Sequence, residues 1–254
     1  MSEDISFSHG LVLKSGWVKP NALFPHKVIH KPTQRLWKGM HPWIRDHFDN
    51  KFQGTVTHYD ALGSALRTAT GFCSSPVGAS THFVIDRNGD LYQLASIHDR
   101  TWHAGQNSDE WSECGGQYTM PNGEKTKSPN QWFLGIDLSN WGYLNYDKAS
   151  HKYYSWTKTE VPSSRVGFDA GGKPWELYQL DALDTYGDLI WLLSSELGIK
   201  AEMHVGHSDV APKNKVDPGP LLHHRDLITE IYEAMSSHEP VGVDHNRRGS
   251  ESDI

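Results

Sequence analysis

The segment THFVIDRNGDLYQL, residues 81–94, restricts the fold more than any other part of the chain. Two apolar runs flank Asn88-Gly89, a dipeptide that readily adopts the positive φ values required at a tight hairpin turn. The pattern predicts two antiparallel strands joined by a short turn. This is the clearest β signal in the chain.

Further strands and helices alternate along the chain on either side of this hairpin. Strands are predicted in three places: a short one ending near His58, one within residues 131–142 and one at residues 200–207. Helices are predicted in three places: Leu62 to Gly71, about Pro174 to Leu197 with Gly198 as C-cap, and Leu221 to Met235. The polar segments 105–130 and 143–173 predict loops. This order predicts an α/β (α+β) single domain, in which helices flank a mixed central β-sheet.

Composition narrows the class of protein. The chain has 254 residues, of which 37% are hydrophobic, and this content is typical of a folded protein. Its net charge is −7 and no lysine- or arginine-rich stripe is present, so we expect no nucleic-acid partner. No apolar run approaches the roughly 20 residues of a membrane span. Cys73 and Cys114 are too few for a disulfide framework or a cysteine-rich zinc site.

The two ends of the chain differ from its centre. Residues 1–50 hold short apolar pieces between prolines and predict an irregular N-terminal segment packed on the domain. Residues 51–235 hold the predicted strands and helices, and residues 236–254 predict a disordered polar tail. The acidic N-terminus has neither the basic start nor the apolar stretch of a secretory signal peptide. We therefore expect a protein that is cytoplasmic as made.

The segment HVGHSDVAPKNKVDPGP, residues 204–220, gathers groups that bind metals or transfer protons. His207 follows an apolar strand, and Asp217 comes ten residues later, before a Pro-Gly turn. Imidazole nitrogen and carboxylate oxygen both suit Zn²⁺, and a catalytic zinc site needs three protein ligands and one open position. A histidine and an aspartate at this spacing are by themselves more typical of a polar loop that caps helix ends.

Several segments of the chain, taken together and in order, resemble one known family. They are HYDALGSALRTAT, SPVGASTHFVIDRNGDLYQL, DRTWHAG, LGIDLSN and VGHSDVAPKNKVDPGP, within residues 55–225. They are similar to the zinc-dependent N-acetylmuramoyl-L-alanine amidases, a superfamily that includes phage lysozyme-type amidases and animal peptidoglycan recognition proteins. The resemblance implies that residues 51–235 form an amidase catalytic domain, with a zinc site in a cleft at the edge of the sheet.

The resemblance also implies the zinc ligands. His58, His207 and Asp217 fall at the three ligand positions, and Lys215 falls two residues before the third. His30, in KVIHKPT, is an alternative first ligand because it also ends an apolar stretch. His58 is preferred because the helix between it and His82 matches the layout of the family, whereas His30 would require a long insertion.

The proton-transfer group implied by the resemblance is Asp137. The family often has glutamate in a GIEL strand, and this chain has GIDL, whose carboxylate is one methylene shorter. Phage-type members use a tyrosine directly before the His-Phe pair, where this chain has Thr81, which cannot take that role. Trp102 and His103, in the WHAG motif, are expected to border the cleft and contact substrate.

The implied activity is hydrolysis of the amide bond between N-acetylmuramic acid and L-alanine. The expected cofactor is Zn²⁺, the expected partner is peptidoglycan or a muropeptide, and the expected state is a monomer. To act on intact wall, the protein would have to be released or injected. Two alternatives stay open: a non-catalytic peptidoglycan- or muropeptide-binding module, and a structural component of a phage or secretion particle that reuses the fold.

Overall fold

The computed structural model describes residues 16–21, 24–34, 36, 52–74, 78–104, 118–119, 125–126 and 129–237. The predicted tail from residue 238 onward lies outside the described residues, as does most of the predicted loop 105–130. Within that loop, β5 (Tyr118–Thr119) pairs with β6 (Lys125–Thr126). None of the helices in the described part of the chain is long and apolar enough to cross a membrane.

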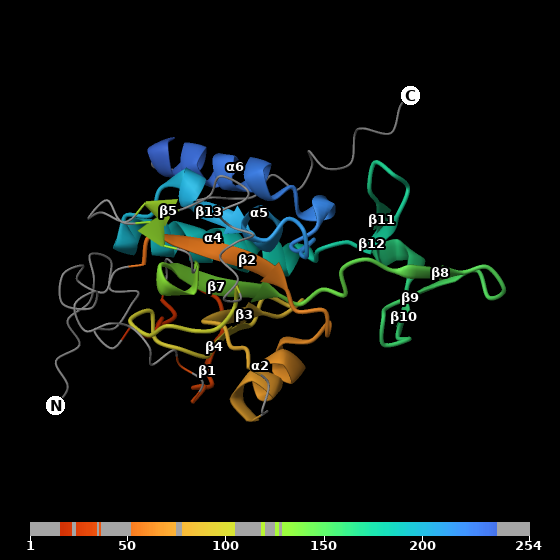
Figure 1. Cartoon of the computed structure of the whole chain (residues 1–254), viewed down its shortest axis with the longest axis horizontal. Coiled ribbons are helices and arrows are strands. Elements are labelled where there is room, and N and C mark those ends of the chain that lie inside the picture. The colour runs from red at the N-terminus through yellow and green to blue at the C-terminus, as the bar shows by residue number, and fades with distance from the viewer. Residues whose placement is uncertain are drawn as a thin grey trace.

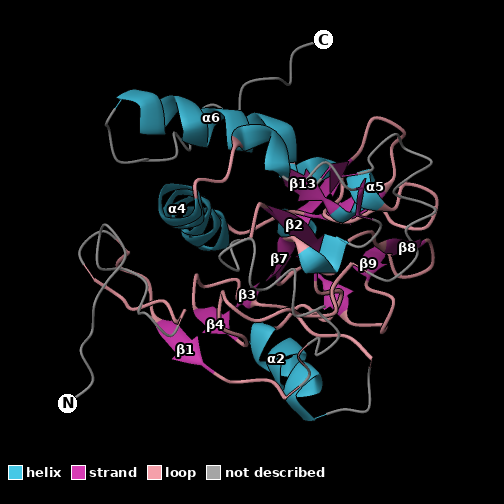
Figure 2. Ribbon diagram, turned by 60° about the vertical axis from the view of Figure 1, so that its left-hand side comes forward, coloured by secondary structure: helices cyan, strands magenta, loops and turns pink. Residues whose placement is uncertain are grey.

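A six-stranded sheet forms the centre of the protein, in the order β1-β4-β3-β7-β2-β13 (Figures 1 and 2). Its strands are β1 (Val28–His30), β2 (Gly54–Tyr59), β3 (Phe83–Ile85), β4 (Leu91–Gln93), β7 (Phe133–Leu138) and β13 (His204–Gly206). The β3–β4 pair is antiparallel, and the other four pairings are parallel. The predicted mixed central sheet is therefore confirmed.

Helices cover both faces of this sheet. Figure 2 shows α2 (Ala65–Ser74) on the opposite side from α4 (Leu180–Leu197) and α6 (His224–Ser237). Side chains alternate between the faces along each strand. Phe83 and Ile85 of β3 accordingly join the main core with α4 and α6, whereas Val84 joins the smaller cluster beneath α2.

Local sequence signals located some element ends correctly. The predicted hairpin is the β3–β4 pair, and Gly89 has the positive φ of +79° that its turn requires. The C-terminus of α4 is also confirmed, because Gly198 caps it in the left-handed conformation at φ +69°.

Other predicted ends were wrong. The helix α2 continues through Gly71 to Ser74, because Phe72 and Cys73 pack against the cluster beneath it and outweigh the cost of a helical glycine. The helix α4 begins at Leu180, because the preceding residues form β12 (Pro174–Glu176), paired with β11 (Val166–Phe168). The helix α6 begins at His224, after a short 3-10 turn (Pro220–Leu222) and His223 at φ +50°.

The N-terminal segment contributes to the sheet, although the sequence predicted it to be irregular. Residues Val28–His30 form β1 and pair in parallel with Leu91–Gln93 of β4. Backbone pairing along an open strand thus orders a segment whose own apolar pattern is too short to identify. The proposed boundary at residue 51 therefore does not coincide with an edge of the sheet.

Residues 143–176, which we call the arm, were predicted as a polar loop and instead fold into short strands. The arm contains a sheet of β8 (Asn145–Asp147), β9 (Lys152–Tyr154) and β10 (Glu160–Val161), together with the β11–β12 pair. A small apolar cluster of Trp141, Leu144 and Val161 supports it. Figure 1 shows the arm projecting from the main body on the side where β2 and β7 end.

Candidate metal centre and active site

The candidate site lies at the carboxyl ends of three neighbouring parallel strands. His58 is near the end of β2, Asp137 is its direct partner on β7, and His207 directly follows β13. The carboxyl ends of parallel strands meet at one edge of a sheet, and ligands commonly bind there in α/β proteins. The topology therefore collects these side chains from three distant parts of the sequence.

Gly206 allows the third group, Asp217, to reach this edge. A Cβ atom at residue 206 would lie 2.7 Å from Cδ of Pro218, so only a glycine lets the end of β13 approach the turn that follows Asp217. The Ser208 N–H donates to the carbonyl of Asp217 over 2.8 Å, and the Tyr178 hydroxyl donates to the carbonyl of Pro218 over 2.7 Å. The loop 207–217 is thereby closed on itself.

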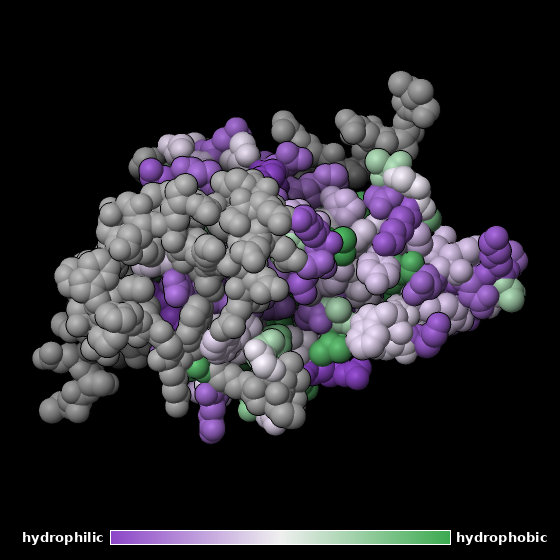
Figure 3. Space-filling model, viewed as in Figure 1, coloured by the Kyte–Doolittle hydropathy of each residue, from purple (hydrophilic) through white to green (hydrophobic). Residues whose placement is uncertain are grey.

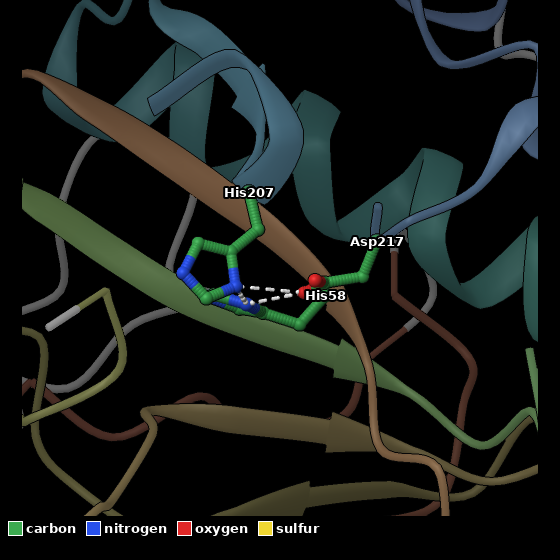
Figure 4. Close-up of side chains that lie close together, drawn as sticks. All are labelled: His58, His207 and Asp217. Atoms are coloured by element: carbon green, nitrogen blue, oxygen red, sulfur yellow. Dashed lines mark hydrogen bonds and ion pairs between the residues drawn. The ribbon is translucent and has the colours of Figure 1, made fainter. Parts of the chain in front are cut away.

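The side chains of His58, His207 and Asp217 converge at this edge of the sheet (Figure 4). Nδ1 of His58 lies 3.0 Å from Nδ1 of His207 and 3.0 Å from Oδ2 of Asp217, and the His207–Asp217 distance is 2.8 Å. All three side chains are buried, and their ligand atoms lie within 4.8 Å of one another. This group can hold a metal ion.

The charge states of this group suit metal binding. Burial, followed by repulsion from His207, lowers the pKa of His58 to about 4, so its imidazole is neutral at pH 7. Burial acts to raise the pKa of Asp217, but the short contacts with His207 and His58 outweigh it and hold this pKa below its usual range. A neutral imidazole and an ionised carboxylate are the forms that bind metals.

A second histidine fixes the tautomer of the first. Nε2 of His103 lies 2.9 Å from the Phe133 carbonyl, which can only accept, so this nitrogen donates. Burial and the nearby His58 hold the pKa of His103 well below its usual range, so its Nδ1 is a free acceptor. Nε2 of His58, 3.2 Å away, therefore donates to it. The lone pair on Nδ1 of His58 then faces Asp217 and His207, an arrangement that a cation between them would stabilise.

Asp137 lies beside this group and is only 6% exposed. Burial raises its pKa to about 8; the Thr81 hydroxyl opposes the rise, and the charges of Asp60 and Asp217 add to it. In the absence of a cation, the carboxyl group therefore holds a proton at neutral pH. A cation bound nearby would favour its ionised form.

These residues line an open cleft of about 520 Å³. The lining residues are His58, Tyr59, Ala61, Asp137, Tyr143, His207, Asn214, Lys215, Val216 and Asp217. Lys215 is exposed on the wall and can place a positive charge near a ligand. Among the described residues that line the cleft, neither Trp102 nor His103 appears. His103 lies instead against the far side of His58.

The alternative first ligand, His30, lies elsewhere. It ends β1, at the edge of the sheet opposite β13, and its Nε2 donates to the carbonyl of Val18 over 2.8 Å. Four strand spacings separate β1 from β2, which corresponds to about 19 Å. The structure thus brings His58, and not His30, to His207 and Asp217.

Several lining residues were not predicted from the sequence. Tyr59, Asn214 and Val216 could have been found, because they adjoin His58 and Lys215 in sequence. Tyr143 carries no such signal, since it enters the cleft only because the arm folds.

The chain is similar to several known proteins. The curated 1,6-anhydro-N-acetylmuramyl-L-alanine amidase AmpD of Haemophilus influenzae is 24% identical over 195 residues, which cover 76% of this chain and 74% of AmpD. A crystal structure of a selenomethionine AmpD derivative is 18% identical, with a TM-score of 0.47 over 85% of this chain and 98% of that one. AmiD from E. coli, solved with anhydro-N-acetylmuramic acid-L-Ala-D-gamma-Glu-L-Lys, is 20% identical, with a TM-score of 0.47 over 77% of this chain and 60% of that one.

The family comparison covers the whole site. Residues 48–220 match the family described as N-acetylmuramoyl-L-alanine amidase, Amidase_2. This range includes β2, β7 and β13 and therefore every side chain that converges on the cleft. The chain belongs to the Amidase_2 family of N-acetylmuramoyl-L-alanine amidases.

Proposed function

We propose that the protein is a zinc-dependent N-acetylmuramoyl-L-alanine amidase, which hydrolyses the amide bond between N-acetylmuramic acid and L-alanine in peptidoglycan or muropeptides. The observation that carries this proposal is the convergence of His58, His207 and Asp217 beside a buried carboxyl group in one open cleft. Family membership supports it. The catalytic domain is proposed to be residues 51–235.

The zinc ion would be held by His58, His207 and Asp217, two nitrogen donors and one oxygen donor. Three protein ligands leave one position open, as in other catalytic zinc sites. When bound, zinc polarises a carbonyl group and makes water more acidic. Access from one side supports this assignment, because all three ligand residues line the cleft while His103 lies against the opposite side of His58.

Asp137 would move the proton during the reaction. It faces the cleft from the strand next to His58, so its carboxylate can accept a proton from the attacking water and pass it to the leaving amine of L-alanine. Lys215 would stabilise the negative charge that develops on the carbonyl oxygen of the substrate. Its position on the exposed wall supports this role.

His103 would act behind the first ligand, His58. The contacts of His103 with His58 and the Phe133 carbonyl support a positioning role, in which it orients the first ligand. Trp102, which is half-buried, is kept as a candidate substrate contact.

A second candidate function is binding of muropeptides without hydrolysis. The high pKa of Asp137, about 8, favours this alternative, because a protonated carboxyl group cannot act as a base. This alternative also requires that the pKa of Asp137 stay high when zinc is bound. The alternative predicts a protein that holds zinc and muropeptide but does not release L-alanine amino termini.

The test is an amidase assay with controlled metal content. Purified protein is incubated with peptidoglycan sacculi and, separately, with soluble 1,6-anhydro-muropeptides, the substrate type named in its curated relative AmpD. We expect new L-alanine amino termini, loss of activity after chelation and recovery with zinc, with Asp217→Ala as the inactive control. Full activity after rigorous metal removal would overturn the proposal. The substrate that is hydrolysed faster shows whether the protein acts on intact wall or on soluble fragments in the cytoplasm.

A further inference from the structure

The arm lies beside the mouth of the metal cleft. Tyr143, at its start, lines the cleft together with His58 and Ala61. The arm projects from the end of the sheet at which β2 and β7 terminate (Figure 1). A substrate that is longer than the cleft and leaves it on this side therefore runs along the arm.

The arm is mounted rigidly on the domain. Glu176 is 1% exposed and accepts hydrogen bonds from Nη2 of Arg87 at 2.9 and 2.8 Å and from the Trp141 N–H at 2.6 Å. The backbone also pairs across the base, where the Leu144 N–H donates to the Pro174 carbonyl. A surface held in this way binds a ligand without a large cost of ordering a loose loop.

Exposed aromatic side chains gather on the arm. Among the described residues, every large aromatic side chain counted as exposed belongs to it: Tyr143, Tyr146, Trp156 and Phe168. Single exposed aliphatic residues are ordinary, but exposed aromatic rings concentrated beside a cleft mark a binding surface. Figure 3 shows hydrophilic groups between the apolar ones on this lobe, so the surface is not one continuous apolar patch.

Trp156 has a fixed orientation at the lip of the cleft. Its indole N–H donates to the carbonyl of Ala61 over 2.6 Å, and Ala61 lines the cleft. The side chain is nevertheless 57% exposed. Because the only polar group of the ring is already bonded, the exposed part of the ring offers an apolar contact surface for a flat partner.

The surroundings of Trp156 fit a sugar ring. Thr157 and Thr159, which follow it in the chain, are exposed and their hydroxyl groups lie 3.1 Å apart. The hydroxyl of Ser155 is buried and bonds to that of Thr157 over 2.9 Å. A pyranose ring offers an apolar C–H face for stacking and hydroxyl groups for hydrogen bonds at its edge.

The charge of the arm also favours a neutral partner. It carries five basic side chains against four acidic ones: Lys148, Lys152, Lys158, Arg165 and Lys173 against Asp147, Glu160, Asp169 and Glu176. This near balance gives little long-range attraction to a polyanion or to an acidic stem peptide. An uncharged glycan does not require such electrostatic attraction in order to bind.

We propose that the arm binds the glycan part of the substrate, with Trp156 stacking on a pyranose ring at the lip of the metal cleft. This inference rests on the proposed function, since it names the part of that substrate that extends beyond the cleft. Aromatic contacts at the lip then hold the sugar while the lactyl amide lies at the cleft residues. The peptide stem is not the partner of the arm.

Calorimetric titration of the full chain, freed of metal, with an N-acetylglucosamine tetramer tests the proposal. Wild type is expected to bind this probe, and Trp156→Ala to bind it about tenfold more weakly, which corresponds to about 1.4 kcal/mol. Trp156→Phe keeps a ring and should retain most of the affinity. Leu66→Ala is the matched control, because Leu66 is similarly exposed, at 53%, on α2 outside the arm. Thermal unfolding of each variant verifies that it is folded.

A parallel titration with the stem peptide L-Ala-γ-D-Glu-L-Lys separates the two parts of the substrate. The proposal is overturned if wild type does not bind the glycan probe, if Trp156→Ala binds it as tightly as wild type, or if the variant loses affinity for the stem peptide instead. These titrations measure binding to the metal-free protein and require no hydrolysis of substrate, so their result is independent of amidase activity. Glycan binding without release of L-alanine termini would refute the proposed function and leave the role of the arm intact.

Discussion

His58 on β2 and Asp137 on β7 are direct partners in the parallel pairing of these strands. Paired residues of adjacent strands project from the same face of a sheet. The candidate metal ligand and the candidate base are therefore held at a fixed separation by backbone hydrogen bonds in the centre of the sheet. A chemical step that needs both groups at once benefits from this rigidity.

Replacing Asp137 with asparagine is expected to stabilise the folded, metal-free protein at pH 8. The gain in stability relative to wild type should be smaller at lower pH. Burial raises the pKa of Asp137 to about 8 in the folded chain, whereas the value in an unfolded chain is about 3.9. Between these values the unfolded chain releases its proton first, so the folded state loses stability as pH rises. The difference in Tm between Asp137→Asn and wild type should widen from about pH 4 to about pH 8 and then stay constant.

Thermal unfolding across this pH range measures the effect. Added zinc should narrow the difference at pH 8, because a nearby cation favours the ionised carboxylate of the wild type. A Tm difference that does not change with pH would show that Asp137 is already ionised in the folded, metal-free protein.

The two candidate first ligands give opposite predictions. His58→Ala should weaken zinc binding by several kcal/mol and abolish amidase activity, because it removes one of three converging ligand atoms. His30→Ala should leave most of both, since His30 is bonded to Val18 at the far edge of the sheet. Elemental analysis and the amidase assay check both variants. An essential His30 with a dispensable His58 would contradict the arrangement of the sheet.

Features that have a local signal, or that several motifs in order identify, could be predicted from the sequence. Asn88-Gly89 identified the hairpin because the turn depends on the backbone freedom of two adjacent residues. His58, His207 and Asp217 were selected together because the family resemblance places all three, and the structure brings them together.

Features that depend on contacts between distant segments could not be predicted from the sequence. Strands β8 to β12 have two or three residues each, too few for an apolar alternation to be read, so the arm was taken for a loop. His103 was expected to border the cleft, but its ring lies on the side of His58 away from Asp217, and the two histidines are 45 residues apart in sequence. Neither contact can be derived before the topology is known.

Glu176→Gln should loosen the base of the arm. Glu176 is buried and pairs with Arg87 and, at 3.5 Å, with Arg165, so loss of its charge leaves these guanidinium groups without their anion. We expect the free energy of unfolding to fall by about 1–3 kcal/mol, because hydrogen bonds to a buried charged group are lost.

Urea denaturation measures this change, and limited proteolysis locates it. Glu160→Gln is the matched control, since Glu160 pairs with Lys152 on the exposed surface of the same arm and should change stability by less than about 1 kcal/mol. Equal effects of the two substitutions would mean that Glu176 does not anchor the arm.

His103→Ala is expected to weaken zinc binding by about 10–100-fold without removing any ligand atom. His103 accepts from Nε2 of His58 and donates to the carbonyl of Phe133, and so keeps the lone pair of His58 directed at Asp217 and His207. Without it, His58 can adopt the other tautomer or rotate. Competition with a coloured chelator measures the zinc affinity of each variant.

Two further measurements distinguish this positioning role from general destabilisation. His103→Asn should restore part of the affinity, because its side-chain oxygen can take the place of Nδ1 as acceptor, while His151→Ala, an exposed histidine of the arm bonded to Tyr146, should leave it unchanged. Nitrogen-15 NMR of the histidine rings should place the proton of His58 on Nε2 and the proton of His103 also on Nε2. A proton on Nδ1 of His58 would contradict this pair of hydrogen bonds. A zinc affinity of His103→Ala within about twofold of wild type would contradict the positioning role, because the expected loss is at least about tenfold. In that case His103 would serve only to fill the space behind His58.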